Sequence, residues 1–371
     1  MTKAYYFDAA ASTQLNKRVL GAMLPFFVED YANPNSFHAL GEKARVAVEK
    51  SRALLAREIN AKPHEIYFTS GTTESNNWAL RGTAKTNGKI IVSSIEHASI
   101  METAMQLNKE GSSVVILSVN GDGIVNLDEL KREISKKAKI VSVMHANNVI
   151  GSVQDIAAIG KLCRSRNVLF HTDAAQAFGK MKIDVRTMNI DLLSAGAHKL
   201  GGPKGIGFLY VREDVKIEPL IYGGGQERGM RGGTENVAGI VGFAAALEEM
   251  KKVNAKKVQV LRDYIMRGIE ELGGVINGTK EQRLYNNVHA SFERVDGGTL
   301  AAFLSQNGVY VSTGSACDSR KDKDDHVLKA IGLKKELIDS SIRMTLPVDV
   351  TRVGCDALLK TLQKGVKVLR R

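Results

Sequence analysis

Seven short apolar runs that alternate with helical stretches constrain the fold of this chain more than any other feature. Several runs are continuously apolar, which is typical of strands covered on both faces of a sheet. The segments between them, such as 155–166, place apolar residues at i, i+3 and i+4 spacing. This alternation predicts an α/β fold with a mostly parallel sheet between layers of helices. The predicted strands are 65–70, 89–94, 113–119, 139–145, 168–173, 191–196 and 206–211.

The regular alternation of predicted strands and helices ends near residue 235. A long helical stretch begins there, and shorter mixed units follow it. A chain of 371 residues is long enough for two domains, at roughly 100–200 residues per domain. We predict a large α/β domain over residues 14–250, and a smaller α+β domain formed by residues 1–13 together with residues 251–371.

The cysteine count and the hydropathy of the chain indicate its compartment. Three cysteines, at positions 163, 317 and 355, are too few and too odd in number for a disulfide framework. The longest apolar run, 238–247, is about half the length of a membrane helix. The N-terminus turns acidic too early for a secretory signal. We therefore expect a cytoplasmic protein without membrane contact.

Positive charge is concentrated in the last third of the chain. The net charge is +12, and residues 251–371 hold 22 basic and 14 acidic residues. No nucleic-acid-binding motif accompanies this bias, so we expect no direct contact with DNA or RNA. The basic third is a candidate docking surface for an acidic protein.

Polar residues concentrate at the C-terminal ends of five of the predicted strands. Open α/β sheets bind their ligands at this edge. The chain has neither a P-loop nor a dinucleotide fingerprint, and its cysteines and histidines lack the spacing of metal ligands, so we expect no metal. The polar segments are 70–77, 96–100, 144–148, 171–176 and 194–205.

Each of these segments allows a structural and a chemical interpretation. Residues 71–73 open a helix, where they either form a capping turn or bind a phosphate. Asp173 ends an apolar strand, so it either caps the next helix or meets a buried cation such as a protonated pyridine. His97 is either a core histidine or a ring stacked on a flat ligand. Lys199 lies in a glycine-rich turn, either as a surface lysine or close to a ligand.

Ten motifs in order resemble the cysteine desulfurases of the NifS/IscS type, in the class V group of pyridoxal-phosphate (PLP) enzymes. The resemblance covers nearly the whole chain and implies the PLP-dependent transferase fold of type I. The motifs are YFDAAAST (6–13), NPNSFHALG (33–41), FTSGTTESNN (68–77), EHASI (96–100), MHANNVIGSVQDI (144–156), HTDAAQAFGK (171–180), AHKLGGPKGIGFLYVR (197–212), GGGQERGMRGGTEN (223–236), STGSACDS (312–319) and SIRMTL (341–346).

The resemblance implies a role for each residue around the PLP ring. Lys199 would form the Schiff base with PLP, and Asp173 would pair with the pyridine nitrogen and strengthen the electron sink. His97 would stack on the ring and assist proton transfer. Gln176 would hydrogen-bond the phenolic oxygen, and Asn147 would lie near that oxygen or the substrate carboxylate.

The resemblance also implies how phosphate and substrate are bound. Thr72, Thr73 and His198 would form the phosphate site. Thr234 would come from the neighbouring subunit, which makes a homodimer part of the expectation. Arg343 would bind the α-carboxylate of L-cysteine through its planar guanidinium.

Cys317 is the candidate nucleophile because it lies in a polar segment, 311–326, without apolar periodicity. Cys163 and Cys355 lie on apolar helix faces, which predicts core packing. The resemblance implies that Lys199 removes the α-proton of L-cysteine and that Cys317 takes the sulfur as a persulfide, with release of L-alanine. The sulfur would pass to an acceptor protein, such as an iron–sulfur scaffold or a carrier for tRNA thiolation.

Three positions depart from the family pattern. Gly196 stands where the family usually has a serine that donates to the phosphate, so we expect a lower PLP affinity. Val149 replaces an acidic residue, and Gly201 replaces a larger side chain. None of the three makes or breaks bonds, so we expect activity.

Two other functions remain open. One is selenocysteine lyase or another class V PLP activity, although transamination needs no nucleophilic thiol. The other is a PLP-poor homologue that acts as a sulfur-carrier scaffold, for which Gly196 and Val149 are the motivation.

Overall fold

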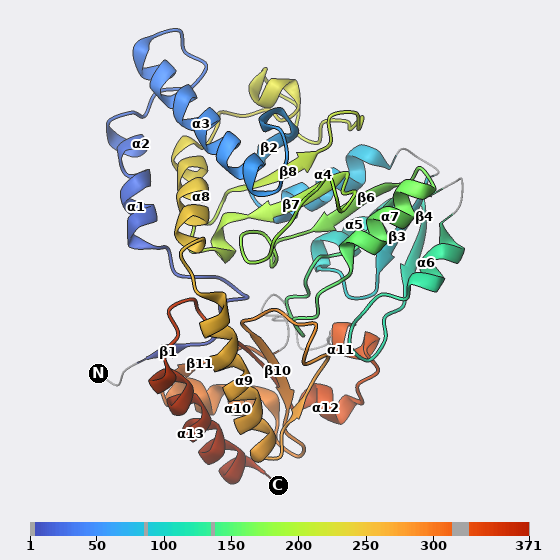
Figure 1. The fold of residues 1–371 in the computed structure, drawn as a ribbon, viewed down its shortest axis with the longest axis vertical. Helices are drawn as coiled ribbons and strands as arrows, with labels where there is room; N and C mark the ends of the chain where they lie inside the picture. Colours follow the sequence, from blue (N-terminus) through green and yellow to red (C-terminus); the bar gives the residue numbers. More distant parts are fainter. Residues whose placement is uncertain (1–3, 85–87, 135–137, 314–325, 371) are drawn as a thin grey trace.

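A seven-stranded sheet forms the centre of the larger part of the molecule (Figure 1). The computed structural model describes residues 4–84, 88–134, 138–313 and 326–370. The strand order is β2-β8-β7-β6-β5-β3-β4, and of these seven strands only β8 runs opposite to the others, so it pairs antiparallel with both of its neighbours, β2 and β7. All seven predicted strands are confirmed, as is the mostly parallel sheet. They are β2 (Ile66–Thr69), β3 (Lys89–Ser93), β4 (Ser113–Leu117), β5 (Ala138–Ser142), β6 (Leu169–Asp173), β7 (Leu192–Gly196) and β8 (Gly207–Val211).

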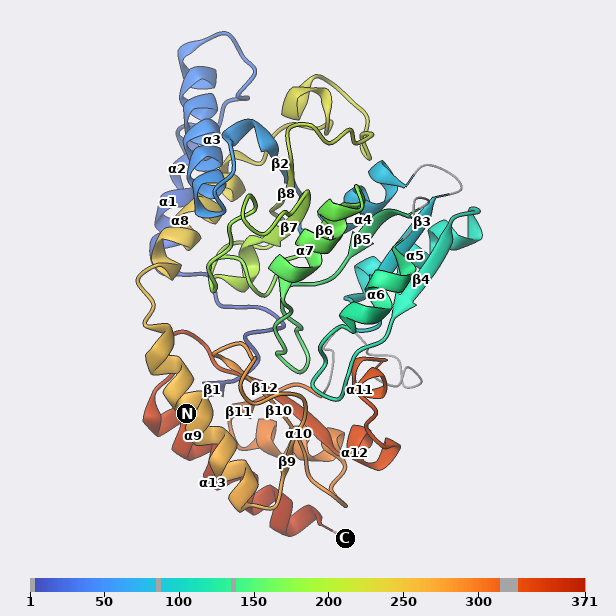
Figure 2. The ribbon, with the colours of Figure 1, turned by 45° about the vertical axis from the view of Figure 1, so that its right-hand side comes forward.

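Helices cover both faces of this sheet (Figure 2). Successive strand residues point to opposite faces, and Leu192 and Leu193 accordingly belong to different apolar clusters. This explains why the strands read as continuous apolar runs. Helices α4 (Thr72–Thr83) and α5 (Ala98–Lys109) pack on one face, and α3 (Ala39–Glu58), α7 (Ile156–Ser165) and α8 (Val237–Met250) pack on the other.

Two smaller sheets form the lower part of the molecule in Figure 1. An antiparallel sheet has the order β12-β10-β9, and β1 pairs with β11 in parallel, so residues near the N-terminus join the C-terminal third. The division at residues 13 and 250 stays a prediction. The elements here are β1 (Tyr5–Tyr6), β9 (Val275–Ile276), β10 (Asn287–Ser291), β11 (Val309–Tyr310), β12 (Ser341–Thr345), α9 (Ala255–Glu271), α10 (Gly297–Gln306) and α13 (Arg352–Leu369).

The remaining elements are short helices and 3-10 turns. They are α1 (Lys17–Met23), α2 (Pro25–Val28), α6 (Leu127–Glu133), α11 (His326–Ala330), α12 (Lys335–Asp339) and the 3-10 turns η1 (Pro63–Glu65), η2 (Ala197–Lys199) and η3 (Gln226–Gly229). Within the described ranges, no helix is long and apolar enough to cross a bilayer.

The two described cysteines are core residues, as predicted. Cys163 on α7 and Cys355 on α13 are both fully buried. Burial raises the pKa of the Cys163 thiol to about 12 and that of the Cys355 thiol to about 11. Both thiols are therefore protonated at neutral pH, and neither is a ready nucleophile.

Candidate active site

Asp173 is the buried centre of a hydrogen-bonded chain at the end of β6. Asn76 Nδ2 donates to Asp173 Oδ2 at 2.7 Å and to Ser99 Oγ at 2.9 Å. Ser99 Oγ in turn lies 2.8 Å from His97 Nδ1. The amide of Ala175 donates to Asp173 Oδ1 at 2.9 Å. The chain thus connects Asp173 to His97 through Asn76 and Ser99, from three different elements.

The surroundings of Asp173 fit a cationic ring nitrogen. The residue is 3% exposed, and within the described residues its donors are neutral and no basic side chain forms an ion pair with it. A buried carboxylate without a cation is costly. A protonated pyridine supplies the missing charge, so this site fits PLP.

His97 begins α5 and is oriented by its own helix. Its Nδ1 accepts a hydrogen bond from the amide of Ser99 at 3.1 Å. An Nδ1 that accepts leaves the proton of a neutral imidazole on Nε2. The residue is half-buried.

Lys199 and Gln176 meet at one carbonyl of the N-terminal segment. Lys199 lies in η2, directly after β7, and its Nζ donates to the carbonyl oxygens of Ala10 at 2.6 Å and Ala11 at 2.8 Å. Gln176 Nε2 donates to the same Ala10 oxygen at 3.1 Å. Lys180 Nζ donates to Gln176 Oε1 at 3.1 Å. Burial and the charge of Lys199 lower the pKa of Lys180 to about 7.

His198 lies at the phosphate end of the predicted site, beside the first turn of α4. Burial, together with the charges of Lys199, Lys204 and Lys180, lowers the pKa of His198 to about 4. The imidazole is therefore neutral at pH 7. The first amides of α4, at Thr72 and Thr73, have no acceptor within the helix, which favours an anion there.

Glu96 and Asn147 hold the loops around His97. Glu96 is fully buried and accepts hydrogen bonds from Ser93 Oγ and from the amide of Met144, at 2.5 and 2.8 Å. Burial, together with the nearby charge of Asp173, raises the pKa of Glu96 to about 8. Asn147 Nδ2 donates to the carbonyl of Ile95 at 2.9 Å, so its side chain is engaged between loops. Its predicted contact with the ring or substrate stays a prediction.

Arg343 on β12 offers an unsatisfied donor for a carboxylate. Its side chain is 2% exposed. Nη2 donates to Asp8 Oδ1 at 2.8 Å, and Nη1 donates to the carbonyl of Asn148 at 3.3 Å. Nε is buried without a hydrogen-bond partner in the described part of the chain. An unpaired buried donor is costly, and a substrate carboxylate would satisfy it.

The segment that carries Cys317 starts and ends beside these residues. Cys317 itself lies outside the described residues. Ser312, shortly before it, pairs with Arg343 through two backbone hydrogen bonds of 3.0 and 2.7 Å. His326, shortly after it, has Nε2 at 2.9 Å from the carbonyl oxygen of Glu96, the neighbour of His97.

Thr234 does not join the other candidates within one subunit. It is exposed and makes no hydrogen bond to them in the described residues. Its segment is anchored by Glu227, which accepts from Nη1 and Nη2 of Arg52 at 2.8 Å each and from the amide of Phe68 at 2.8 Å. Glu227 and Arg228 both have left-handed backbones, at φ 46° and 57°. Such a conformation costs a non-glycine residue roughly 1–2 kcal/mol, so this anchoring offsets strain.

Two of the three departures from the family pattern have structural reasons. Gly201 has φ +81°, a conformation that favours glycine over a larger side chain. Val149 is 1% exposed and packs in an apolar cluster with Met144, Val327 and Leu328. An acid at position 149 would enter that cluster.

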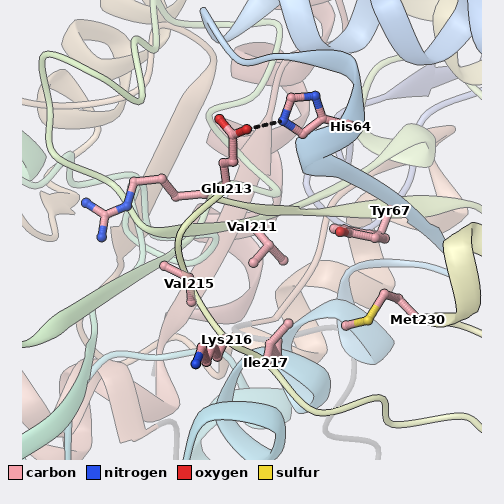
Figure 3. Close-up of a pocket in the computed structure, with 9 residues that line it drawn as sticks. His64, Tyr67, Val211, Glu213, Val215, Lys216, Ile217 and Met230 are labelled. Carbon is pink, nitrogen blue, oxygen red and sulfur yellow. Dashed lines mark ion pairs between the residues drawn. The ribbon is translucent and has the colours of Figure 1, made fainter.

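Two pockets differ in their relation to these residues. A cleft of about 1030 Å³ is lined by Lys199, Lys180 and the N-terminal segment Ser12–Arg18, among others. A separate pocket of about 290 Å³ lies at the end of β8 and contains none of the predicted site residues (Figure 3). There His64 Nε2 and Glu213 Oε1 lie 3.4 Å apart above Val211.

Sequence reasoning assigned no role to Asn76, Ser99, Glu96 or Asp8. Asn76 carried a usable signal, because it lies three and four residues before Ala79 and Leu80 on the buried face of α4. Asp8 follows the apolar run 5–7, where a charged residue needs a partner. The partners of both residues are distant in sequence, and no local pattern identifies them.

Comparisons with known proteins identify the family of this chain. The aminotransferase class-V family model matches residues 5–358. The chain is 45% identical to the cysteine desulfurase IscS of Clostridium botulinum, over 100% of this chain and 96% of the relative. A solved NifS-like protein has a TM-score of 0.93 and 38% identity, covering 99% of this chain and all of the other.

A solved complex with bound cysteine is also similar. It is titled SspA in complex with cysteine, and it has a TM-score of 0.85 and 37% identity over 93% of this chain and 99% of the other. The family match, the full-length identity and the shared fold agree with the motifs found in the sequence. The chain belongs to the aminotransferase class-V family and, within it, to the PLP-dependent cysteine desulfurases of the NifS/IscS type.

Proposed function

We propose that this cysteine desulfurase converts L-cysteine to L-alanine and carries the sulfur as a persulfide on Cys317 to an acceptor protein. The observation that carries the proposal is the position of the two ends of the Cys317 segment. Ser312 pairs with Arg343, and His326 contacts the loop of His97. Both described flanks of the segment that contains Cys317 therefore lie beside residues that we expect to bind the substrate.

The described side chains supply binding and proton transfer. Bound PLP supplies an electron sink for negative charge at the α-carbon of an amino acid. Asp173 would hold the ring nitrogen in its protonated form, and Arg343 would bind the substrate carboxylate. Lys199 Nζ takes the α-proton, and His97 Nε2 donates or accepts a proton during sulfur removal.

The sulfur step needs no external oxidant. The Cys317 thiolate forms a bond to the sulfur of L-cysteine, and the bond between that sulfur and the β-carbon breaks. The electron pair of the broken bond stays with the carbon, which then takes a proton and becomes the methyl group of alanine. One cysteine and one enzyme thiol thus give one alanine and one persulfide.

Alanine formation from L-cysteine tests this function. The wild-type protein should form alanine, while Lys199→Ala and Cys317→Ser should fall to background. A matched control is Cys355→Ser, a thiol in the core whose loss should leave the site intact. Full-rate alanine formation by Cys317→Ser would exclude the persulfide route.

A homodimer is the second part of the proposal. An apolar surface on α1, α2 and the start of α3 is exposed in the single chain, with exposed fractions of 57% at Phe27, 70% at Val28 and 69% at Tyr31. Contiguous apolar surface of this kind marks an interaction site. Asn35 Nδ2 donates to Glu235, so the Thr234 segment borders this surface. A second copy on this surface would receive Thr234.

Mixed dimers test whether Thr234 acts in the partner's site. One dimer combines a Lys199→Ala subunit with a Thr234→Ala subunit, and the other combines wild type with a Lys199→Ala, Thr234→Ala double variant. In the first dimer the intact Lys199 site receives an intact Thr234, whereas in the second it does not. We expect weaker PLP binding in the second dimer only. Equal PLP affinity in both dimers would contradict the exchange.

The acceptor is proposed to be an acidic sulfur carrier or an iron–sulfur scaffold in the cytoplasm. The basic excess of residues 251–371 supports this, and α13 alone carries Lys360, Lys364 and Lys367. Because exposed charges are screened by salt, binding of such a carrier should weaken between low and high ionic strength. Binding that is insensitive to salt would contradict an electrostatic docking surface.

A further inference from the structure

Lys180 has an unusual environment for a lysine, at the end of the turn that follows β6. Its side chain is half-buried and lines the cleft of about 1030 Å³ together with Lys199. Within the described residues it forms no ion pair, and its Nζ donates one hydrogen bond, to Gln176 Oε1 at 3.1 Å. Lysines are mostly exposed, and an amine withdrawn from water without a carboxylate is costly. None of the steps proposed for the reaction uses Lys180.

The backbone of the turn places Lys180 beside Gln176. Gly179 has φ +69°, a left-handed conformation that favours glycine. The amide of Lys180 donates to the carbonyl oxygen of Ala177 at 3.0 Å, which closes the turn. The contact between the side chains of residues 176 and 180 is therefore built into the local fold.

The amide of Gln176 is held at both of its ends. Lys180 Nζ donates to Oε1, and Nε2 donates to the carbonyl oxygen of Ala10 at 3.1 Å. A carboxamide has an acceptor end and a donor end of nearly the same shape, so its partners determine which end faces which way. Lysine carries N–H groups in its charged and in its neutral form, and it selects the oxygen of Gln176 in both.

Of these two partners, only Lys180 is reserved for Gln176. The Ala10 oxygen also accepts from Lys199 Nζ, at the shorter distance of 2.6 Å. Lys180 Nζ, in contrast, bonds to Gln176 alone in the part of the chain that the structure describes. Gln176 is only 4% exposed, so a wrongly turned amide would find little water to satisfy it.

We propose that Lys180 is a positioning residue for PLP, which turns the amide nitrogen of Gln176 toward Lys199 and the phenolic oxygen expected beside it. The inference rests on the proposed function, because it requires PLP in this site. Gln176 Nε2 carries two hydrogens, and the Ala10 oxygen takes one of them, which leaves the other for the ligand. Without Lys180 the amide can turn over and present Oε1, whose lone pairs repel a phenolic oxygen.

A double-mutant cycle in the full-length apoprotein tests this dependence by titration with PLP. Lys180→Met and Lys180→Ala both lack the N–H groups, and each should bind PLP about 10-fold more weakly, because a hydrogen bond to a charged group is lost. Gln176→Ala should lose about the same. Adding Lys180→Met to Gln176→Ala should cause no further loss, because Lys180 acts only through Gln176.

A matched control removes a charge from the same cleft without touching Gln176. Lys204 lines this cleft as well, and its charge, like that of Lys180, acts on His198. Lys204→Met should bind PLP close to wild type. Thermal melting of the apoproteins checks that each variant is folded.

Two further readouts separate positioning from a structural role or a simple loss of charge. The analogue 3-deoxypyridoxal phosphate lacks the phenolic oxygen, and its affinity should be the same for wild type and Lys180→Met. The absorption maximum of bound PLP should shift alike in Lys180→Met and Gln176→Ala, because the phenolic oxygen is part of the chromophore. Lys204→Met should leave that maximum in place.

Wild-type PLP affinity in both Lys180 variants would overturn the proposal. A combined loss of about 100-fold in the double variant would also overturn it, because the two residues would then act independently. So would an equally weakened affinity of Lys180→Met for the analogue. These outcomes are distinct from failure of the proposed function, in which the wild-type protein itself would bind no PLP or form no alanine.

Discussion

Asp173 and Thr72 stand at opposite ends of the predicted PLP site, and their surroundings differ. Each Asp173 carboxylate oxygen already accepts a hydrogen bond, from Asn76 and from the Ala175 amide. Thr72 Oγ1 has no such partner in the described part of the chain, and in our proposal Thr234 would come from another subunit. The fold therefore orients the Asp173 end without a ligand, whereas the other end would be completed by a phosphate and, as proposed, a second copy.

This difference separates the residues expected to orient the PLP ring from those expected to contribute most to PLP affinity. A preorganised carboxylate fixes the chemistry of the ring without reorganisation. Open amides and hydroxyls gain most from a dianion, which pairs donors that are otherwise unsatisfied. We expect variants at the Asp173 end to change both affinity and turnover, and variants at the Thr72 end to change mainly affinity.

Asp173→Asn should have the largest effect. Removing the partner of a buried cation costs about 3 kcal/mol or more, or roughly 100-fold in PLP affinity. Alanine formation should fall as well at saturating PLP, because the ring nitrogen loses its anion. The control is Asp155→Asn, which alters the cap of α7. If Asp173→Asn kept the wild-type rate of alanine formation, the Asp173 end would affect affinity alone, and the expected difference between it and the Thr72 end would be wrong.

Asn76→Ala should have an intermediate effect. It leaves Asp173 Oδ2 without its donor and cuts the connection to Ser99 and His97, at a cost of about 1–3 kcal/mol. PLP titration and alanine formation measure this loss. Asn77→Ala is the matched control on the same helix, because Asn77 bonds to Thr73 and Thr103 and not to Asp173. Equal losses in both variants would point to damage to α4 instead.

Glu96→Gln should leave PLP affinity unchanged while altering the pH dependence of stability. Glu96 is protonated in the folded protein up to pH about 8 but ionised in the unfolded chain above pH roughly 4.3. Unfolding in this window releases a proton, so the free energy of unfolding falls as pH rises, by at most about 1.4 kcal/mol per pH unit.

The glutamine side chain is neutral at every pH, so the Glu96→Gln variant lacks this fall in the free energy of unfolding. Melting of both proteins at pH 5 and pH 8 should show the variant gaining on wild type at the higher pH. A difference in stability that is the same at both values would mean that Glu96 is already ionised in the folded state.

Local patterns in the sequence predicted the scaffold well. The strands β6 and β7 are continuous apolar runs because they are buried on both faces, and their polar ends hold Asp173 and precede Lys199. Burial of Cys163 and Cys355 also followed from helical periodicity. These features depend on neighbours within a few residues, and the apolar pattern carries that information.

Contacts between distant residues were not predictable from such patterns. Asp8 and Arg343 are 335 residues apart, and Asn76 and Asp173 are 97 apart. The left-handed conformation of Gly201 was likewise not predictable from local patterns. It occurs in the turn after β7, where the Gly201 carbonyl accepts a hydrogen bond from the amide of Asn16.

Mass spectrometry of the protein after addition of L-cysteine tests the central claim most directly. The account predicts one added sulfur atom on the peptide that contains Cys317, in the wild-type protein and not in Lys199→Ala. Sulfur on Cys163 or Cys355 instead, or alanine formation without any modification of Cys317, would contradict it.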